Sequence, residues 1–465
     1  MSKTFRSYTL NQRLLLPPDL REWLPEGHLA LFVSDVVDAL DLSAIFAVYE
    51  QGDGRGQPPY DPALMVKLLV YGYCTGKPSS RQIEQATYEE VPYRVLAADQ
   101  HPDHASIADF RKRHLAALAN LFVQVLRLCQ AAGLVKLGHV ALDGTKVKAN
   151  ASKHKAMSYG RMAGAEQKLE EEVQALLAQA GAVDRAEDAR YGKSQRGDEL
   201  PAELARRESR LRKIREAKAA LEQEARVQAE AAAAAAHAKI AARQRYEAET
   251  GQKAKGRAPT VPAPAQARPA AKAQRNFTDP ESRIMKDGAT KAFEQAYNAQ
   301  VAVDSQAQVI VAAAVTQEAN DKQQLVPMLG AVQDNVGQLP EKASADTGFF
   351  SEANLTAKAV AGVDLYVPPE RPSPPTPDAV APAAASPEGS VREQMRHKLR
   401  TPEGQAVYRM RKAIVEPVFG QIKEGRGFRR FLFRGLAQVA AEWTLICLTH
   451  NLLKLFRGRT GLLAA

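Results

Sequence analysis

The spacing of apolar residues changes at Gly138, and this change limits the possible folds more than any other feature of the chain. Before Gly138, apolar residues recur three and four positions apart, as they do along one face of a helix. After it, short apolar runs bounded by turn residues predict strands, and the first covers 139–145. Strands and helices then alternate. The sequence therefore predicts a mixed α/β sheet domain that follows an all-helical region.

The all-helical region is predicted to form a domain of its own, residues 1–134. Asp61 followed by Pro62 is a typical helix start, with a capping side chain and a proline at the first helical position. Another helix begins after Asp103 and carries the basic run from Arg111 to His114. Short helices with basic tips fit a helix-turn-helix-like DNA reader, and they fit a plain helical bundle equally well.

The later elements are predicted from the same periodicities. Strands over 296–304 and 308–315 are joined by a short turn, and a helix over 321–336 is expected to end at Gly337. The elements that follow are a strand at 342–346, a helix at 352–360, a strand at 364–367, a helix around Glu416 and a last helix at 439–456. We expect residues 135–164 and 276–460 to form this sheet domain.

A long charged insertion separates the first strand from the second. Over 165–250, apolar residues recur at the heptad spacing of a coiled coil within a sequence rich in Ala, Glu, Lys and Arg. A helical hairpin that dimerises or clamps DNA fits this pattern, and so does a solvated helical spacer. The stretch 251–275 is predicted to be a disordered basic linker, and 368–392 a second, proline-rich linker.

The charge and the cysteine spacing limit the classes of protein to which this chain can belong. The net charge of +10 points towards a nucleic acid or an anionic surface, although charge alone is a weak argument. Three widely spaced cysteines argue against a disulfide framework or a zinc cluster and fit a reducing cytosol. We expect no signal peptide and no membrane span, because no apolar stretch is long enough.

Three acidic residues stand out by position. Asp143 ends the first strand, Asp346 ends the strand at 342–346, and Glu416 lies on a late helix. If the two strands are neighbours, both aspartates project at one edge of the sheet, where a helix packed across that edge would add Glu416. Carboxylates gathered in one place repel each other unless cations neutralise them, so such clusters are usually metal sites. Taken singly, each acid is also an ordinary turn or capping residue.

Oxygen ligands without Cys or His favour Mg²⁺ or Mn²⁺ over Zn²⁺. Two such ions would activate a water or a 3′ hydroxyl and stabilise the leaving oxygen of an in-line phosphodiester displacement. The chain has no Gly-rich phosphate loop of the G-x-x-x-x-G-K-[ST] kind, so no nucleoside triphosphate is expected to drive the reaction.

Basic residues surround Glu416. Residues 409–434 contain eight Lys or Arg and two Glu, a local net charge of 8 − 2 = +6. A phosphate backbone is the natural partner of such a segment. The residues expected to contact DNA are Tyr408, Arg411, Lys412, Lys423, Arg426, Arg429 and Arg430.

These motifs together resemble those of a bacterial insertion-sequence transposase of the DDE class, in the group whose third motif is Y-x2-R-x3-E-x6-K. Tyr408-x2-Arg411 and Glu416-x6-Lys423 match that motif. Four residues, and not three, separate Arg411 from Glu416, and the three-residue spacing falls on Lys412.

The other motifs support the resemblance. Leu142-Asp143-Gly144-Thr145 corresponds to the first motif of the family and Ala345-Asp346-Thr347-Gly348 to the second. The stretch from about Tyr8 to His114 resembles the helical domain that precedes the catalytic domain in these proteins.

The resemblance implies an RNase H-like catalytic fold in which Asp143, Asp346 and Glu416 are the metal ligands. It also implies that Tyr408, Arg411 and Lys423 position DNA near the scissile phosphate, and that the helical domain binds the terminal inverted repeats. The implied partners are double-stranded DNA, both transposon end and target, and a second copy of the chain in the synaptic complex. The implied location is the bacterial cytoplasm, at the nucleoid.

The sequence therefore predicts a DDE transposase that performs metal-dependent cleavage at transposon ends and strand transfer into target DNA. Two alternatives keep the same motifs: a metal-dependent nuclease that joins no strands, and a catalytically inactive DNA-binding regulator of the element. A coiled-coil scaffold explains residues 165–247 and nothing else.

Overall fold

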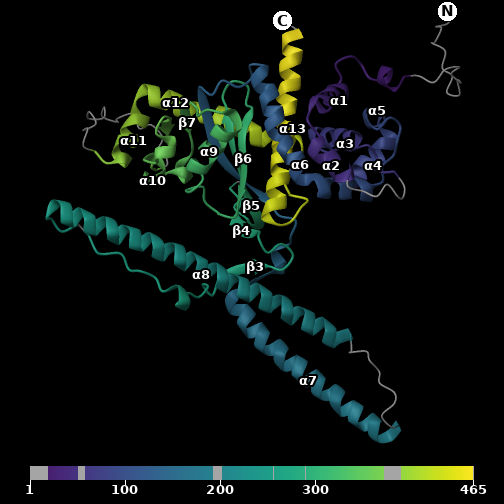
Figure 1. The fold of residues 1–465 in the computed structure, drawn as a ribbon, viewed down its shortest axis with the longest axis vertical. Coiled ribbons are helices and arrows are strands. Elements are labelled where there is room, and N and C mark those ends of the chain that lie inside the picture. Colours follow the sequence, from purple (N-terminus) through teal and green to yellow (C-terminus); the bar gives the residue numbers. More distant parts are fainter. Residues whose placement is uncertain are drawn as a thin grey trace, which may run out of the picture. The chain divides into compact units, whose positions relative to one another are not determined.

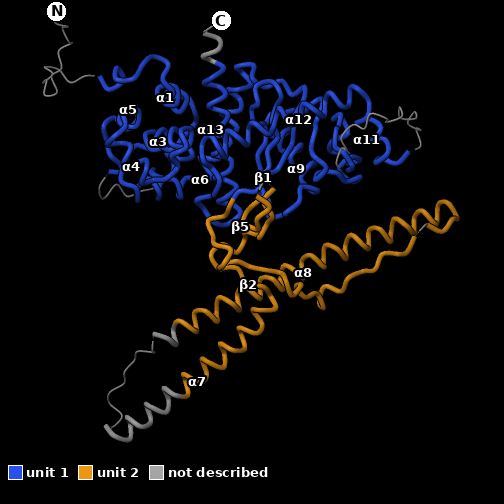
Figure 2. The backbone as a smooth tube through the Cα atoms, turned by 180° about the vertical axis from the view of Figure 1, so that it is seen from behind, with its two compact units in different colours: residues 1–147, 298–465 blue, residues 148–297 orange. Residues whose placement is uncertain are grey.

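The computed structural model describes residues 19–50, 58–191, 202–254, 256–288, 290–370 and 389–463. The chain divides into two compact units (Figures 1 and 2). The first unit combines 1–147 with 298–465, and the second consists of 148–297. Each unit has buried apolar residues of its own.

The first unit begins with helices, which confirms the prediction for the N-terminal region. They are η1 (Leu20–Trp23), α1 (Leu29–Ala39), α2 (Ser43–Glu50), α3 (Pro62–Cys74), α4 (Ser80–Glu89), α5 (Val91–Leu96) and α6 (His104–Ala131). Asp61 starts α3 by accepting hydrogen bonds from the N–H groups of Ala63 and Leu64. Asp103 starts α6 in the same way. Sequence alone therefore located both starts, because capping is a local interaction.

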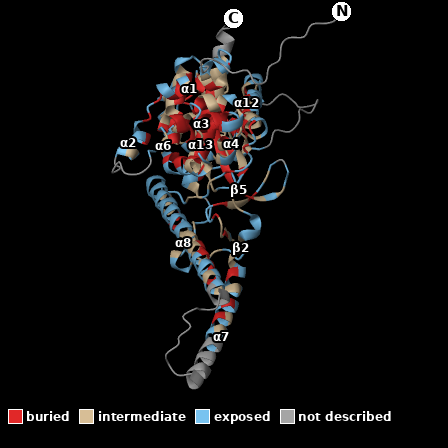
Figure 3. Cartoon of the chain, turned by 90° about the vertical axis from the view of Figure 1, so that its right-hand side faces the viewer, coloured by how far each residue is buried: buried red, intermediate tan, exposed pale blue. Residues whose placement is uncertain are grey.

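Helix α6 lies in the core of this unit. Buried residues gather around α1, α3, α6 and α13 (Leu436–Leu463) in Figure 3, and α6 packs against both α3 and α13. Within the described ranges, α6 is the one helix long and apolar enough to cross a membrane. Core helices pass the same test, so this is weak evidence for a membrane span. All three cysteines of the chain are free and buried.

The sheet is mixed, as predicted. Its strands are β1 (His139–Lys148), β4 (Arg283–Lys286), β5 (Phe293–Asp304), β6 (Ile310–Thr316), β7 (Lys342–Ser344) and β8 (Asp364–Tyr366). The strand order is β4-β5-β1-β7-β8, and β6 pairs with β5. Strands β1, β7 and β8 run parallel, whereas β5 and β6 form an antiparallel hairpin.

The helices after β6 differ in detail from those expected. They are α9 (Leu325–Val336), η4 (Thr347–Phe349), α10 (Glu352–Leu355), η5 (Lys358–Val360), α11 (Val391–Arg400), α12 (Pro402–Gly420), the π-helical η6 (Gln421–Gly425) and α13. Gly337 ends α9 in the left-handed conformation, as predicted. Asp321 lies in a turn before α9 and not within it. The predicted helix at 352–360 is two short pieces, α10 and η5.

Asn451 ties α13 to the sheet. Its Oδ1 accepts a hydrogen bond from the Ile310 N–H at 2.8 Å, and its Nδ2 donates to the Ile310 carbonyl at 2.8 Å. The neighbouring His450 contacts the Gln308 carbonyl, and burial lowers the pKa of its imidazole to about 3. Both residues are buried and hold the start of β6 against α13, a structural role.

Replacing Asn451 by alanine is expected to lower the free energy of unfolding by about 2–4 kcal/mol, because two buried backbone groups of Ile310 lose their partner. Chemical denaturation followed by tryptophan fluorescence measures this, since Trp23 and Trp443 both lie in the first unit. The control is Gln438→Ala, which removes an exposed amide from the same helix. Equal denaturation midpoints for the two variants would contradict the role assigned to Asn451.

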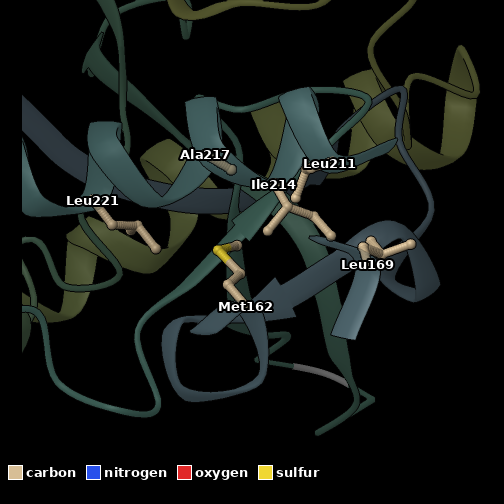
Figure 4. Close-up of a cluster of buried hydrophobic side chains, with 6 residues drawn as sticks. All are labelled: Met162, Leu169, Leu211, Ile214, Ala217 and Leu221. Atoms are coloured by element: carbon tan, nitrogen blue, oxygen red, sulfur yellow. The ribbon is translucent and has the colours of Figure 1, made fainter. Parts of the chain in front are cut away.

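The second unit is a long helical hairpin on a small sheet. Its elements are η2 (Lys153–Lys155), β2 (Ala156–Ser158), α7 (Tyr159–Tyr191), α8 (Ala202–Thr250), η3 (Pro264–Gln266) and β3 (Gln274–Asn276), together with β4 and the first residues of β5. Strands β2 and β3 pair antiparallel. The apolar seam between α7 and α8 consists of Met162, Leu169, Leu211, Ile214, Ala217 and Leu221 (Figure 4).

Of the two predicted linkers, the first lies mostly within the described residues and the second mostly outside them. Residues 251–275 contain η3 and the start of β3, and Arg243 of α8 donates a hydrogen bond to the Gly256 carbonyl at 2.8 Å. Most of the second predicted linker, 371–388, lies outside the described residues.

Candidate active site

Strands β1 and β7 place two of the predicted acids side by side. The strands pair in parallel, with Ala141 opposite Ser344. Asp143 lies two residues beyond Ala141, and Asp346 lies two residues beyond Ser344. The predicted adjacency of these strands is therefore confirmed. Asp143 lies inside β1, which runs on to Lys148, and Asp346 lies two residues past the end of β7, so neither aspartate ends its strand as predicted. Counted from the paired residues, the two aspartates are equally far along the chain.

Each aspartate is held by a nearby backbone N–H group. Asp143 Oδ1 accepts a hydrogen bond from the Gly144 N–H at 2.8 Å. Asp346 caps η4 by accepting from the Gly348 N–H at 2.8 Å. Gly144 is required by crowding, because a Cβ there would lie 2.6 Å from Asp321 Oδ1. A Cβ at Gly348 would likewise lie 2.9 Å from Asp346 Oδ1, so both carboxylates have a glycine beside them where a side chain would crowd.

Asp321 is a third carboxylate at this place, and sequence reasoning did not assign it to the site. Its Oδ1 accepts hydrogen bonds from Asn298 Nδ2 at 2.6 Å and from Gln300 Nε2 at 2.5 Å. Both amides are fully buried and lie two positions apart on β5, so they share a face of that strand. Asn298 and Gln300, two polar residues that alternate with Ala and Val in the middle of β5, were the signal that could have identified it.

Burial and neighbouring charges raise the pKa of both Asp143 and Asp346. Burial raises the pKa of Asp143 to about 6, and the negative charges of Asp346 and Asp321 add to this rise. The Arg411 guanidinium opposes it. Burial, followed by the charge of Asp321, likewise raises the pKa of Asp346 above its usual value. A cation that enters this place is therefore favoured electrostatically.

Helix α12 and the following η6 each place a cation beside β1. The Arg411 side chain is 8% exposed, and its Nη1 lies 3.1 Å from Asp143 Oδ2. Its guanidinium also lies over the Tyr408 ring, 5.7 Å from the ring centroid. Lys423, in η6, donates to Thr145 Oγ1 at 2.5 Å and to the Lys146 carbonyl at 2.8 Å. Two residues of the predicted third motif, Arg411 and Lys423, therefore contact β1.

Glu416 is exposed on α12. It follows Arg411 by five positions, which places it roughly 140° further around the helix. No hydrogen bond or ion pair joins it to another side chain among the residues that the structure describes. In the same part of the chain, no three Asp, Glu, His or Cys side chains are close enough together to hold a metal ion. Pro417 lies inside α12, and the π-helical turn follows.

The remaining basic candidates separate into two groups. Lys412, Arg429 and Arg430 are exposed, and Arg429 forms an ion pair with Glu424. Arg426 is buried, which does not fit the predicted contact with DNA. Its guanidinium donates to Thr449 Oγ1 at 2.8 Å and to the Ile446 carbonyl at 3.2 Å, and burial lowers its pKa to about 10. Arg426 thus holds the core together beside α13.

Two parts of the chain match known protein-family models. A model described as a transposase domain (DUF772) matches residues 18–113, and a transposase DDE domain model matches residues 383–456. The second range contains Tyr408, Arg411, Glu416 and Lys423. These two matches support an insertion-sequence DDE transposase. No curated protein and no solved structure matches this transposase. Its family implies an enzyme that binds DNA and cleaves or transfers strands.

DDE transposases generally use a divalent metal, and the donor chemistry of this transposase fits one. The nearby carboxylates of Asp143, Asp321 and Asp346 carry hard oxygen atoms, although as they lie in the described part of the chain they are not close enough together to hold an ion. The Oδ1 of Asn298 and the Oε1 of Gln300 are buried there without a hydrogen-bond partner. Oxygen donors of this kind suit Mg²⁺ or Mn²⁺ better than Zn²⁺.

Proposed function

We propose that this transposase cleaves DNA at the ends of its element and joins the freed 3′ ends to target DNA. In this proposal Asp143, Asp346 and Glu416 are the metal ligands of an RNase H-like fold. The observation that supports it most is that the parallel pairing of β1 with β7 brings Asp143 and Asp346 together, beside the helix that carries the third motif. A bound divalent metal supplies an activated water or 3′ hydroxyl and neutralises the leaving oxygen.

The chain's own residues prepare the site for that chemistry. Arg411 partly neutralises Asp143 and fixes its carboxylate. Lys423 is held against β1 by Thr145, which keeps an ammonium group at the edge where the phosphate has to lie. Exposed cations, Lys412, Arg429 and Arg430, extend the basic surface for the DNA backbone.

Glu416 needs a rearrangement to join the aspartates. We infer that the change occurs between Pro417 and η6, since an internal proline and a π-helical turn interrupt the regular hydrogen bonds of the helix there. A rotation of α12 at this place would exchange Arg411 for Glu416 beside Asp143. Arg411 would then be free to contact the DNA phosphate.

The remaining parts have proposed roles as well. The helical domain, 1–134, binds the terminal inverted repeats, and exposed Lys112 and Arg113 are its candidate contacts. Their neighbours Arg111 and His114 are buried and serve the core. Residues 135–164 and 276–460 form the catalytic domain. Two copies hold two transposon ends, and the enzyme acts at the nucleoid in the bacterial cytoplasm.

The test uses the full-length protein and a labelled duplex that carries the flanked end of its own element, with a plasmid as target. Cleavage at the element boundary in Mg²⁺, its loss in EDTA, and joined products with the plasmid are expected. Cleavage without joined products would favour the nuclease alternative. Binding of the end without cleavage would contradict the proposed reaction and favour a regulator.

A further inference from the structure

We propose that the second unit binds the phosphate backbone of duplex DNA in a basic cleft beside the base of the α7–α8 hairpin. The cleft has a volume of about 920 Å³ and lies wholly within this unit. Its basic lining residues are His154, Lys155, Arg161, Arg206, Arg210 and Lys213. The proposal takes DNA as the polyanion from the proposed function, and it adds a binding surface outside the candidate active site.

The charge of the cleft is not neutralised by the protein. Five of its lining residues are Lys or Arg, and none is Asp or Glu. In the described ranges, none of these five cations forms an ion pair. Other cations of α8 do: Arg207 pairs with Glu172, and Arg215 and Lys218 both pair with Glu166. Glu166 and Glu172 of α7 are thus engaged with cations outside the cleft, and like charges inside it repel unless an anion binds.

The arrangement of the cations follows from helix geometry. Arg206, Arg210 and Lys213 are spaced four and three positions apart, so they form one stripe on α8. Lys155 in η2 and Arg161 in α7 line the same cleft. Cations therefore line the cleft from two sides. On a solvated charged face of one helix, they would lie on one side only.

The cleft is supported by the apolar seam. Ile214 lines the cleft and is 1% exposed, and it belongs to the cluster with Met162 and Leu211 shown in Figure 4. Met157 and Phe277, from the segments of β2 and β3, also line the cleft and pack on this cluster. The bases of the basic side chains are therefore held by packed elements before a ligand arrives.

The spacing favours a nucleic-acid backbone over a small anion. From Arg206 to Lys213 the helix rises by roughly 10 Å, at about 1.5 Å per residue. One DNA strand carries a phosphate about every 3.4 Å along the duplex axis, so the stripe spans about three phosphates. No base-specific recognition is needed, and binding should be independent of sequence.

The test measures binding of a random-sequence DNA duplex to the full-length protein in EDTA, as a function of salt. The cleft variant carries Arg206→Gln, Arg210→Gln and Lys213→Gln. The control carries Arg226→Gln, Lys239→Gln and Arg245→Gln, three exposed cations of the same helix outside the cleft. The slope of log K against log salt is expected to become about 2–3 smaller in the cleft variant, since three phosphate contacts are lost. The control slope should stay close to wild type.

An unchanged slope in the cleft variant, or an equal change in both variants, would overturn the proposal. So would a change seen with duplex RNA and absent with duplex DNA, which would indicate another ligand. A charge-preserving variant (Arg206→Lys, Arg210→Lys, Lys213→Arg) should keep the wild-type slope, and circular dichroism verifies the helices of each variant. Element-end cleavage is scored separately, so that failure of the reaction and failure of the cleft are distinguishable.

Discussion

Replacing Asp143 by asparagine is expected to reduce Mg²⁺-dependent cleavage of the element end by about 10³-fold or more, which corresponds to about 4 kcal/mol of transition-state stabilisation. Asparagine keeps the shape of the side chain and an oxygen that can accept from the Gly144 N–H. It removes the negative charge that a divalent metal requires, and it removes the ionic partner of Arg411. The control is Asp334→Asn, an exposed aspartate of α9, which should cleave as wild type does. Activity of Asp143→Asn within tenfold of wild type would refute the assignment.

The same variant has a second readout that separates lost chemistry from lost folding. In EDTA the folded-state pKa of Asp143 is about 6, above its ordinary value of 3.8. The stability associated with the protonated carboxyl is therefore complete below 3.8 and is lost as the pH rises through about 6. Asparagine does not titrate. Between about pH 4 and about pH 7, wild type should lose more unfolding free energy than the variant, by an amount on the order of 2 kcal/mol. Chemical denaturation at both pH values measures this difference.

The two aspartates on β1 and β7 were predictable because the information is local. Each follows a short apolar run, 140–142 before Asp143 and 343–345 before Asp346, and the parallel pairing of β1 with β7 brings the two runs side by side. The helix starts at Asp61 and Asp103 were predictable for the same reason, since a capping side chain contacts N–H groups two or three residues away. Interactions at short sequence separation are what residue patterns encode best.

The structure differs from the sequence-based expectation at residues that are surrounded by segments distant in the sequence. Arg426 lies in a basic stretch of sequence, and it is buried because it packs against α13. The basic stretch alone does not predict that contact. Asp321 seemed to begin a helix, whereas amides from β5 hold it at the site. The heptad pattern of the insertion indicated its apolar seam. It gave no indication of the basic cleft, whose walls come from three separate segments.

The position of Arg411 against Asp143 bears on how the site is assembled. A buried guanidinium beside a carboxylate with a raised pKa means that the aspartate already gains from a positive neighbour. A metal that bound there would compete with Arg411 for the same carboxylate oxygen. Arg411 and Glu416 lie on different sides of α12, so they would contact Asp143 at different stages of the reaction.

Replacing Glu416 by glutamine is therefore expected to reduce cleavage by about 10³-fold, as for a ligand that a divalent metal needs. Asp321→Asn should reduce it by only about 10- to 100-fold, as for a residue that orients the ligands. The structure makes this comparison informative, because Asp321 lies against Gly144 and Gly348 while Glu416 is exposed. Single-turnover cleavage over a range of Mn²⁺ concentrations measures both losses. Glu424→Gln, a neutralised exposed glutamate eight positions further on, is the matched control and should remain active. A larger loss in Asp321→Asn than in Glu416→Gln would make Asp321 the third ligand and would remove the need for α12 to rotate.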